Sequence, residues 1–400
     1  MPPHLFDSFW IGGFEAACHI NAAGVRLDMI AATQHDREVE SDYQLLRSIG
    51  IRTVRDAVRW PLIEGEDGFD FSSFAPMLAA AERHDMQVIW TLCHYGWPDD
   101  VDVFSAAFPD RFVRFCTAVA GYVKAHSSRR PVYIPINEIS FLSWAAGEVG
   151  WFSPFGHGRG VELKRRLIEA AIAGCDAIWA VDRRARIVHV DPVIHVTAPP
   201  TKPDLTCVAA AQRESQFEAW DMLTGIRDRE LGGHPRYLDV MGLNFYHTNQ
   251  WEFPDARLRW EESPRDGRWV PFHRLIAEVY DRYRTPLMIG ETSHFGVGRA
   301  PWLREMTAEL GAACSAGVPL EGVCIFPIID RMSWTDESHW HNSGLWDLIR
   351  RPPGRLERVL NREYAEELQR SQALLPRCDR PGPQVKRSCG RQEQGRPVPP

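Results

Sequence analysis

Two glutamates that follow apolar stretches are the residues of this sequence best suited to acid–base chemistry. Glu138 comes directly after "VYIPIN", and Glu291 ends "PLMIGE". Two carboxyl groups that flank one bond can cleave a glycoside, because one protonates the departing oxygen while the other attacks or activates water. The glutamates lie far apart in the chain, so this chemistry requires a fold that brings them together.

The pattern of apolar stretches predicts such a fold. Eight short stretches of strand character begin near residues 9, 51, 87, 132, 186, 238, 286 and 321. Segments with helical spacing lie at 36–48, 73–84, 109–126, 161–184, 212–231, 272–283, 302–316 and 355–374. Strands that alternate with helices and are apolar throughout are typical of an α/β (β/α)8 TIM barrel. A doubly wound open sheet is the alternative fold.

Polar residues near the strand ends should meet at one mouth, because the active site of such a barrel lies at the C-terminal ends of its strands. These residues are Glu15, Arg55, His94, Asn137, Glu138, Asp191, Asn244, Tyr246, Glu291 and Asp330. We expect Arg55 to keep one glutamate ionised, while desolvation or the like charge raises the pKa of the other. Asn137 is expected to hold a sugar hydroxyl.

The order of these motifs resembles the family-one glycoside hydrolases, which are retaining β-glycosidases on this barrel, from about residue 9 to about 347. "PINEIS" resembles the family's Thr-x-Asn-Glu-Pro motif, with Ile139 in place of Pro, and this resemblance implies that Glu138 is the acid/base. "IGETS" is similar to Ile-Thr-Glu-Asn-Gly, which implies that Glu291 is the nucleophile.

Three further motifs extend the resemblance. "VRDAVRWPLIE" is similar to Tyr-Arg-Phe-Ser-x-x-Trp-Pro-Arg-Ile, which implies that Arg55 lies beside the nucleophile. "TLCHYGWP" resembles Thr-Leu-x-His-Trp-Asp-x-Pro, so His94 is expected to bind a sugar hydroxyl. "GLNFYHT" resembles Gly-Leu-Asn-Tyr-Tyr, which implies that Tyr246 touches the nucleophile and that Asn244 belongs to the site.

The departures from the family cluster on sugar recognition. His19 stands where the family has Gln, and Asn21 stands where it has Glu. In "FPIIDRMSW", Phe326 replaces a stacking Trp and Ser333 replaces a Glu that clasps sugar hydroxyls, whereas Trp334 is kept. We expect His19 and Trp334 to contact substrate. Because an unpaired buried hydroxyl is penalised, the missing Glu should cost affinity for plain glucosides or galactosides.

Composition sets the domain organisation. The chain has 400 residues, 44% of them hydrophobic, which suits one barrel domain over residues 1–375. Residues 376–400 hold many Pro and basic residues and almost nothing apolar, so we expect a disordered tail. A formal net charge of -7 argues against nucleic acid as a partner. The N-terminus lacks a signal-peptide pattern, and the chain lacks an apolar run long enough to span a membrane.

Nine scattered cysteines without a CxxC pair indicate reduced thiols, a cytoplasmic location and no zinc site. The spacing of His189 and His195 around Pro192 also argues against a metal at the fifth strand. We expect no cofactor, and the sequence leaves the oligomeric state open.

The sequence thus predicts a retaining β-glycosidase, acting on a small glycoside or oligosaccharide, whose two carboxyl groups lie about 5 to 5.5 Å apart. Three alternatives remain. An acceptor alcohol could replace water, which would make the protein a transglycosidase. A degenerate barrel could bind a glycan without cleaving it, and a metal barrel of the xylose-isomerase type is a third interpretation.

Overall fold

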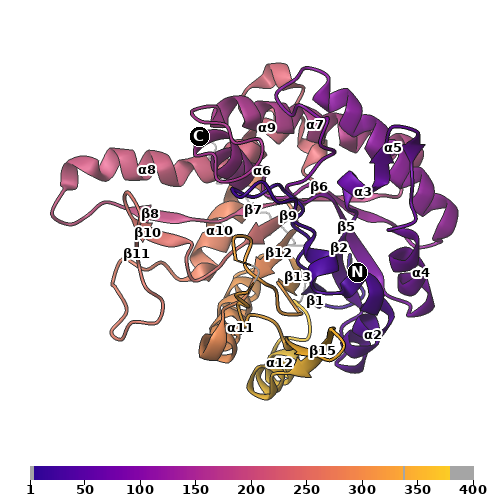
Figure 1. Cartoon of the computed structure of the whole chain (residues 1–400). Coiled ribbons are helices and arrows are strands. Elements are labelled where there is room, and N and C mark those ends of the chain that lie inside the picture. The colour runs from indigo at the N-terminus through magenta and orange to yellow at the C-terminus, as the bar shows by residue number, and fades with distance from the viewer. Residues whose placement is uncertain (1–3, 337, 379–400) are drawn as a thin grey trace, which may run out of the picture.

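Eight parallel strands close into a barrel at the centre of the protein (Figure 1). The computed structural model describes residues 4–336 and 338–378. The strands are neighbours in the order β1-β2-β5-β6-β7-β9-β12-β13, and β13 pairs with β1 to complete the circle. They are β1 (Trp10–Gly13), β2 (Thr53–Ala57), β5 (Gln87–Cys93), β6 (Val132–Ile136), β7 (Arg186–Pro192), β9 (Val240–Asn244), β12 (Leu287–Thr292) and β13 (Leu320–Ile325). The eight predicted strands and the predicted TIM barrel are confirmed, and the open sheet is excluded.

Helices surround the barrel (Figure 1). The longer ones are α2 (His35–Ser48), α4 (Ala75–Arg83), α5 (Phe108–His126), α7 (Gly160–Val181), α8 (Thr206–Glu214), α9 (Glu218–Thr224), α10 (Phe272–Tyr283), α11 (Arg299–Ser315) and α12 (Arg362–Leu374). The shorter elements are α1 (Met29–Ala32), α3 (Trp60–Ile63), α6 (Ile139–Leu142), the π-helical turn η1 (Ser143–Glu148), the 3-10 turns η2 (Pro203–Leu205), η3 (Ser215–Phe217), η4 (Arg229–Leu231), η5 (Pro235–Tyr237) and η6 (Gly296–Gly298), and the hairpin β3 (Glu64–Gly65) and β4 (Gly68–Phe69).

Two helix predictions are wrong in part. The segment 212–231 is broken, because α9 ends where Gly225 takes a left-handed backbone with φ 77°. Residues 355–360 form β15 (Arg355–Leu360), which pairs antiparallel with β14 (Trp346–Arg351), and the helix begins only at Arg362. Hydrogen bonds from a neighbouring strand decided the second case, and helical spacing along one segment cannot reveal such a partner.

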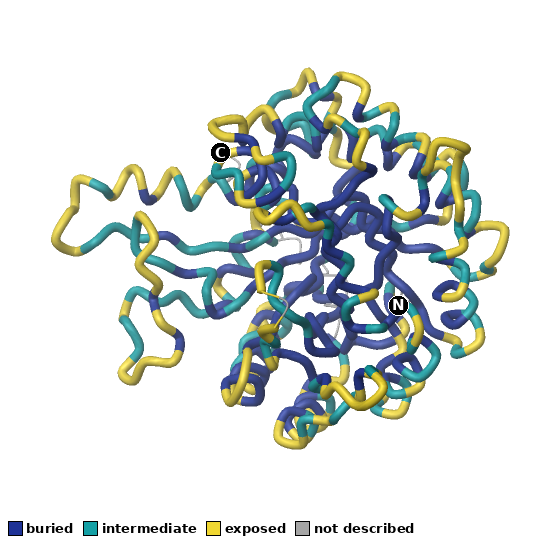
Figure 2. Tube along the Cα trace, in the orientation of Figure 1, coloured by how far each residue is buried: buried dark blue, intermediate teal, exposed yellow. Residues whose placement is uncertain are grey.

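The apolar core has two layers, which lie inside the barrel and between the barrel and its helices. Side chains of alternate strand positions fill the interior with Ile11, Ile89, Val132, Ile134, Val188, Val190, Val240, Met288 and Cys324. The outer layer is larger and includes Trp60, Trp220 and Trp302, each 1% exposed or less. Figure 2 shows this buried centre within a more exposed shell. Packing on both faces fixes where each strand ends, and therefore where the residues after it lie.

A side lobe projects from the barrel at the left of Figure 1. It consists of residues 195–214 and 250–257, which contain α8 and the strands β8 (His195–Thr197), β10 (Gln250–Glu252) and β11 (Ala256–Arg257). The strands form a separate sheet in the order β11-β10-β8. The lobe thus adds a wall beside the C-terminal ends of the barrel strands.

The C-terminal end of the described chain corrects two predictions. Residues 376–378 belong to the packed structure, since Arg377 donates hydrogen bonds to the carbonyl oxygens of Phe6 and Asp7 and Cys378 is buried. The predicted tail from residue 379 onward lies outside the described residues. Cys378 also forms a disulfide with Cys314 of α11, so not every cysteine is a reduced thiol. The partners are far apart in sequence, and only the fold brings them together.

Within the described ranges, no helix combines the length and the apolar character that crossing a membrane requires.

A buried histidine ties α2 to the barrel below the site. The Nδ1 atom of His35 lies 2.8 Å from a carboxylate oxygen of Asp42, and Nε2 lies 2.9 Å from one of Asp56 on β2. Burial alone would lower the pKa of His35, but the two carboxylates outweigh it and raise this pKa to about 9. His35 is therefore a cation at neutral pH, and it stabilises the strand that carries Arg55.

We predict a pH-dependent loss of stability for His35→Gln. A raised folded-state pKa contributes stability below the ordinary value of 6.5, and this contribution is lost as the pH rises through about 9. The wild type should therefore exceed the variant by on the order of 2 kcal/mol in free energy of unfolding at pH 6, and by clearly less at pH 10. Urea unfolding at both values measures this. His339→Gln, at an exposed histidine, is the control, and a His35→Gln deficit that is equal at both pH values would contradict the interpretation.

Candidate active site

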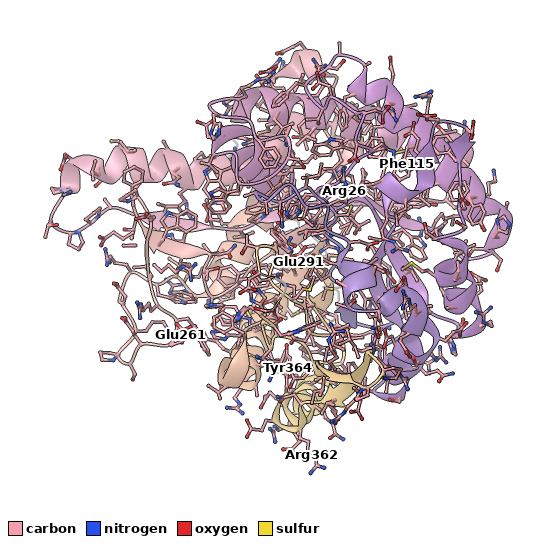
Figure 3. The ribbon with its side chains drawn as sticks, viewed as in Figure 1. Arg26, Phe115, Glu261, Glu291, Arg362 and Tyr364 are labelled. Carbon is pink, nitrogen blue, oxygen red and sulfur yellow. A yellow bond between two sulfur atoms is a disulfide. The ribbon has the colours of Figure 1, made fainter. Side chains whose placement is uncertain are left out.

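A cavity of about 870 Å³ opens at the C-terminal ends of the barrel strands. Seven of the candidate site residues singled out in the sequence line it, namely Glu15, His94, Glu138, Tyr246, Glu291, Phe326 and Trp334. Glu291 lies near the centre of the molecule in Figure 3. Arg55, Asn137 and Asn244 do not line the cavity and lie buried around its carboxyl groups. Barrel closure therefore brings the two glutamates into one cavity, as the sequence predicts.

Glu291 is held on both carboxylate oxygens. Arg55 of β2 donates from Nη1 to Oε1 at 2.6 Å, and the hydroxyl of Tyr246 donates to Oε2 at 2.8 Å. Glu291 is 5% exposed and Arg55 is 1% exposed, so little water screens the pair. An ion pair buried this deeply needs further hydrogen bonds to be tolerated, and Tyr246 supplies one. This geometry suits an ionised carboxylate with a fixed orientation.

Glu138 has a different environment. Its Oε1 accepts a hydrogen bond from Asn244 Nδ2 at 2.7 Å, and its Oε2 accepts one from the hydroxyl of Tyr95. Burial and then the negative charge of Glu291 raise the pKa of Glu138 to about 8, although the two hydrogen bonds oppose this. Glu138 therefore carries a proton at neutral pH, and the cavity contains a proton donor close to a carboxylate that is paired with arginine.

The backbone of Glu138 is also unusual. It takes the left-handed conformation, with φ 45° and ψ 62°, between the end of β6 and the start of α6. This region is costly for residues with a Cβ, and such residues persist where the surrounding structure fixes them. The turn directs the carboxyl group into the cavity rather than along the helix.

The buried side chain of Asn137 connects Arg55, the partner of Glu291, to Tyr95, the partner of Glu138. Its Oδ1 accepts a hydrogen bond from Arg55, and its Nδ2 donates to the hydroxyl of Tyr95 at 2.9 Å. Asn137 is 0% exposed and does not line the cavity. Its contact with a sugar hydroxyl stays a prediction. Its Nδ2 also lies 3.2 Å from His94 Nε2. Asn137 thereby positions the residues around both carboxyl groups.

His94 lines the cavity, whereas His19 lies behind the cavity wall. Burial, followed by the charge of Arg55, lowers the pKa of His94 well below its ordinary value, so the cavity-lining imidazole is neutral. His19 is 1% exposed and packs against Phe152 and Trp334, with ring centres 4.2 and 4.9 Å away. His19 does not line the cavity, and its contact with substrate stays a prediction. Its side chain turns into an aromatic layer behind the wall.

Sequence reasoning missed three residues of the site. Tyr95 links Glu138 to Asn137, and Arg331 lies beside Glu15 on the cavity wall. Gly290 makes room for the amide of Asn244, since a Cβ there would lie 2.5 Å from its Oδ1. The position of Tyr95 directly after His94 was the available signal, because that strand end already pointed to the mouth.

One group of side chains in the described part of the chain could hold a metal ion. Ligand atoms of His247, Glu261 and His294 all lie within 4.8 Å of one another, and His247 and His294 line the cavity. Glu261 lies on a loop at the lower left of Figure 3. The Nε2 atom of His294 is 3.0 Å from Glu261 Oε1, and Trp260 and Arg265 of the same loop donate hydrogen bonds to Glu305 of α11.

Solved structures with a similar fold include β-glucosidases. A β-glucosidase from Thermotoga maritima in complex with glucoimidazole has 15% sequence identity and a TM-score of 0.72, over 93% of this chain and 99% of that one. A structure described as a family 1 β-glucosidase from the same organism has 15% identity and a TM-score of 0.69, over 92% and 97%. The AHE enzyme from Alicyclobacillus herbarius has 16% identity and a TM-score of 0.68, over 85% and 87%.

No protein-family model and no curated protein matches the sequence. The predicted resemblance to the family-one glycoside hydrolases is therefore confirmed at the level of the fold: this is a TIM barrel like those of family 1 β-glucosidases, with a divergent sequence.

We predict that Glu291→Gln lowers the pKa of Glu138. The substitution removes a neighbouring negative charge, which is the largest cause after burial that raises this pKa, and it leaves the buried volume nearly unchanged. Titration of carbon-13-labelled glutamate carboxyl groups by NMR would measure the change. Glu367→Gln, which alters a buried carboxylate paired with Arg304 on the helical layer, is the matched control. A Glu138 pKa that is equal in both variants would show that the two carboxyl groups do not interact.

Proposed function

We propose that the protein is a retaining β-glycosidase that acts on a small glycoside or oligosaccharide. The observation that carries the proposal is the unequal environment of two carboxyl groups in one cavity. Glu291 is paired with Arg55, whereas Glu138 has hydrogen bonds from Asn244 and Tyr95, and its pKa is raised by burial and by the charge of Glu291. A carboxylate held by arginine beside a carboxyl group with a raised pKa is suited to nucleophile and acid roles. The fold shared with family 1 β-glucosidases adds support.

In the proposed mechanism, Glu291 attacks the anomeric carbon while Glu138 protonates the departing oxygen. The aglycone leaves, and the sugar stays bound to Glu291 as an ester. Glu138, now ionised, removes a proton from water, and the hydroxide attacks the anomeric carbon and releases the sugar with its configuration retained. Arg55 and Tyr246 hold Glu291 in position for the attack, and each withdraws charge from the leaving carboxylate during the second step.

Transfer to an acceptor other than water is a second candidate function. Trp144, Trp151 and Phe295 line the cavity and are 43%, 55% and 49% exposed, so the rim offers aromatic surface to a second sugar or alcohol. Product analysis with and without an added acceptor alcohol distinguishes the two outcomes of the second step.

We predict that Glu291→Ala lowers kcat/KM by about 10⁴-fold or more on 4-nitrophenyl glycosides, because no nucleophile remains. A panel of nitrophenyl glycosides, tested first on the wild type, identifies the sugar to be used for the kcat/KM measurement. Glu367→Gln, which lies outside the cavity, should stay within about twofold of the wild type. Activity of Glu291→Ala equal to that of the control would refute the assignment of the nucleophile.

We predict that Glu138→Ala lowers activity by an amount that depends on the leaving group of the glycoside. General acid catalysis raises the reaction rate by about 10² to 10⁴-fold where the leaving group needs a proton, and by less where it does not. The variant should therefore lose more activity on alkyl glycosides than on dinitrophenyl glycosides, as steady-state kinetics at pH 6 can measure. Equal losses on both substrates would argue against a proton-donating role.

We also predict that activity falls at high pH. Glu138 must be protonated to act as the acid, and its raised pKa of about 8 keeps the proton until the pH passes that value. The kcat/KM for an alkyl glycoside should therefore decline as the pH rises through about 8, and this limb should be absent in Glu138→Ala. An unchanged limb in that variant would assign the titration to another group.

A further inference from the structure

A third carboxyl group lies on the cavity wall, and the proposed mechanism does not use it. Glu15 follows β1, lines the cavity and is 5% exposed. Its Oε1 accepts hydrogen bonds from the backbone N–H groups of Ala16 and Ala17, both at 3.0 Å. A carboxylate fixed by two backbone donors has a defined direction, and this one presents its other oxygen, Oε2, to the side chain of Arg331.

Arg331 completes an oppositely charged pair on this wall. Its Nε lies 3.3 Å from Glu15 Oε2, and its guanidinium lies 5.5 Å from the ring centre of Trp334. The contact with Glu15 is long for a charged hydrogen bond, so Oε2 keeps acceptor capacity toward the cavity. His94 Nε2, 3.8 Å from Glu15 Oε1, adds a neutral polar group beside the pair.

We propose that Glu15 and Arg331 form a recognition site for the hydroxyl groups of an uncharged sugar, and that this pair selects neutral glycones over anionic ones. This inference rests on the proposed function, because it names the substrate class of the same cavity. A sugar hydroxyl both donates and accepts, so it can donate to Glu15 Oε2 and accept from the guanidinium. The aromatic faces of Phe326 and Trp334, which also line the cavity, suit the apolar side of a sugar ring.

The charges explain the selection. An arginine alone on a cavity wall would attract a carboxylate or phosphate on the sugar. Here Glu15 compensates that positive charge, and its own carboxylate repels a second anion. Removing the charge of Glu15 should therefore release Arg331 to bind an anionic group.

Glu15→Gln tests this while preserving the local structure, because an amide oxygen can still accept the two backbone hydrogen bonds. The kcat/KM for neutral 4-nitrophenyl β-glycosides should fall about 10- to 100-fold, as for loss of a hydrogen bond to a charged group. The ratio of activity on the β-glucuronide to activity on the β-glucoside should rise at least tenfold. Glu367→Gln, which neutralises another buried carboxylate paired with arginine, should leave that ratio unchanged.

Binding of free sugars gives a readout that does not need turnover. Glucose at about 100 mM should raise the Tm of the wild type more than glucuronate does, and Glu15→Gln should reverse the order. Two results would overturn the inference. One is a glucuronide-to-glucoside activity ratio that is the same in Glu15→Gln and Glu367→Gln. The other is a wild-type protein whose Tm rises more with glucuronate than with glucose. If the wild type cleaves no glycoside yet shows this binding preference, the proposed function fails and the recognition site stands. If neither sugar changes the Tm of the wild type, the recognition site fails.

Discussion

The buried guanidinium of Arg55 is the interaction on which the candidate site depends. It contacts Glu291 and Asn137 at once, from a position that is 1% exposed. A fixed positive charge shielded from water allows one carboxylate to stay ionised there. The same shielding makes a second uncompensated negative charge costly, so Glu138 keeps its proton. The guanidinium on β2 thus pairs with one of two identical side chains and leaves the other without a positively charged partner.

The barrel supplies the rigidity that this arrangement needs. A buried arginine is tolerated only if each neighbouring polar atom has a suitable partner, and the partners come from strands that are widely separated in sequence. Asp56, next to Arg55, is anchored by His35 from the helical layer. The packing outside the barrel therefore restrains the position of the charge inside it.

Much of this could be predicted from the sequence, for physical reasons that also mark the limits. Strands buried on both faces are apolar throughout, so the eight barrel strands were recognisable, and the rule that strand ends converge located Glu138 and Glu291. The strand at 355–360 was not recognisable, because its pairing with β14 depends on a distant segment. The burial of His19 and Asn137 behind the cavity wall was not predictable, because the direction of a side chain beyond a strand end depends on packing that no spacing encodes. The place of Tyr95 directly after His94 pointed to the mouth of the barrel, but its left-handed backbone, with φ 67°, was not predictable from the sequence.

The cavity is lined by two parts of the structure, the barrel and the side lobe. Gln212, Trp251 and Arg257, which line the cavity, belong to this lobe, while the carboxyl groups extend from the barrel itself. The lobe has its own small sheet and does not share the barrel's hydrogen-bond network. Insertions or exchanges in the lobe can therefore change the shape of the outer end of the cavity while Glu138 and Glu291 keep their positions. The outer wall of the cavity can thus vary without any change in the barrel, whose architecture this chain shares with a β-glucosidase of 15% sequence identity.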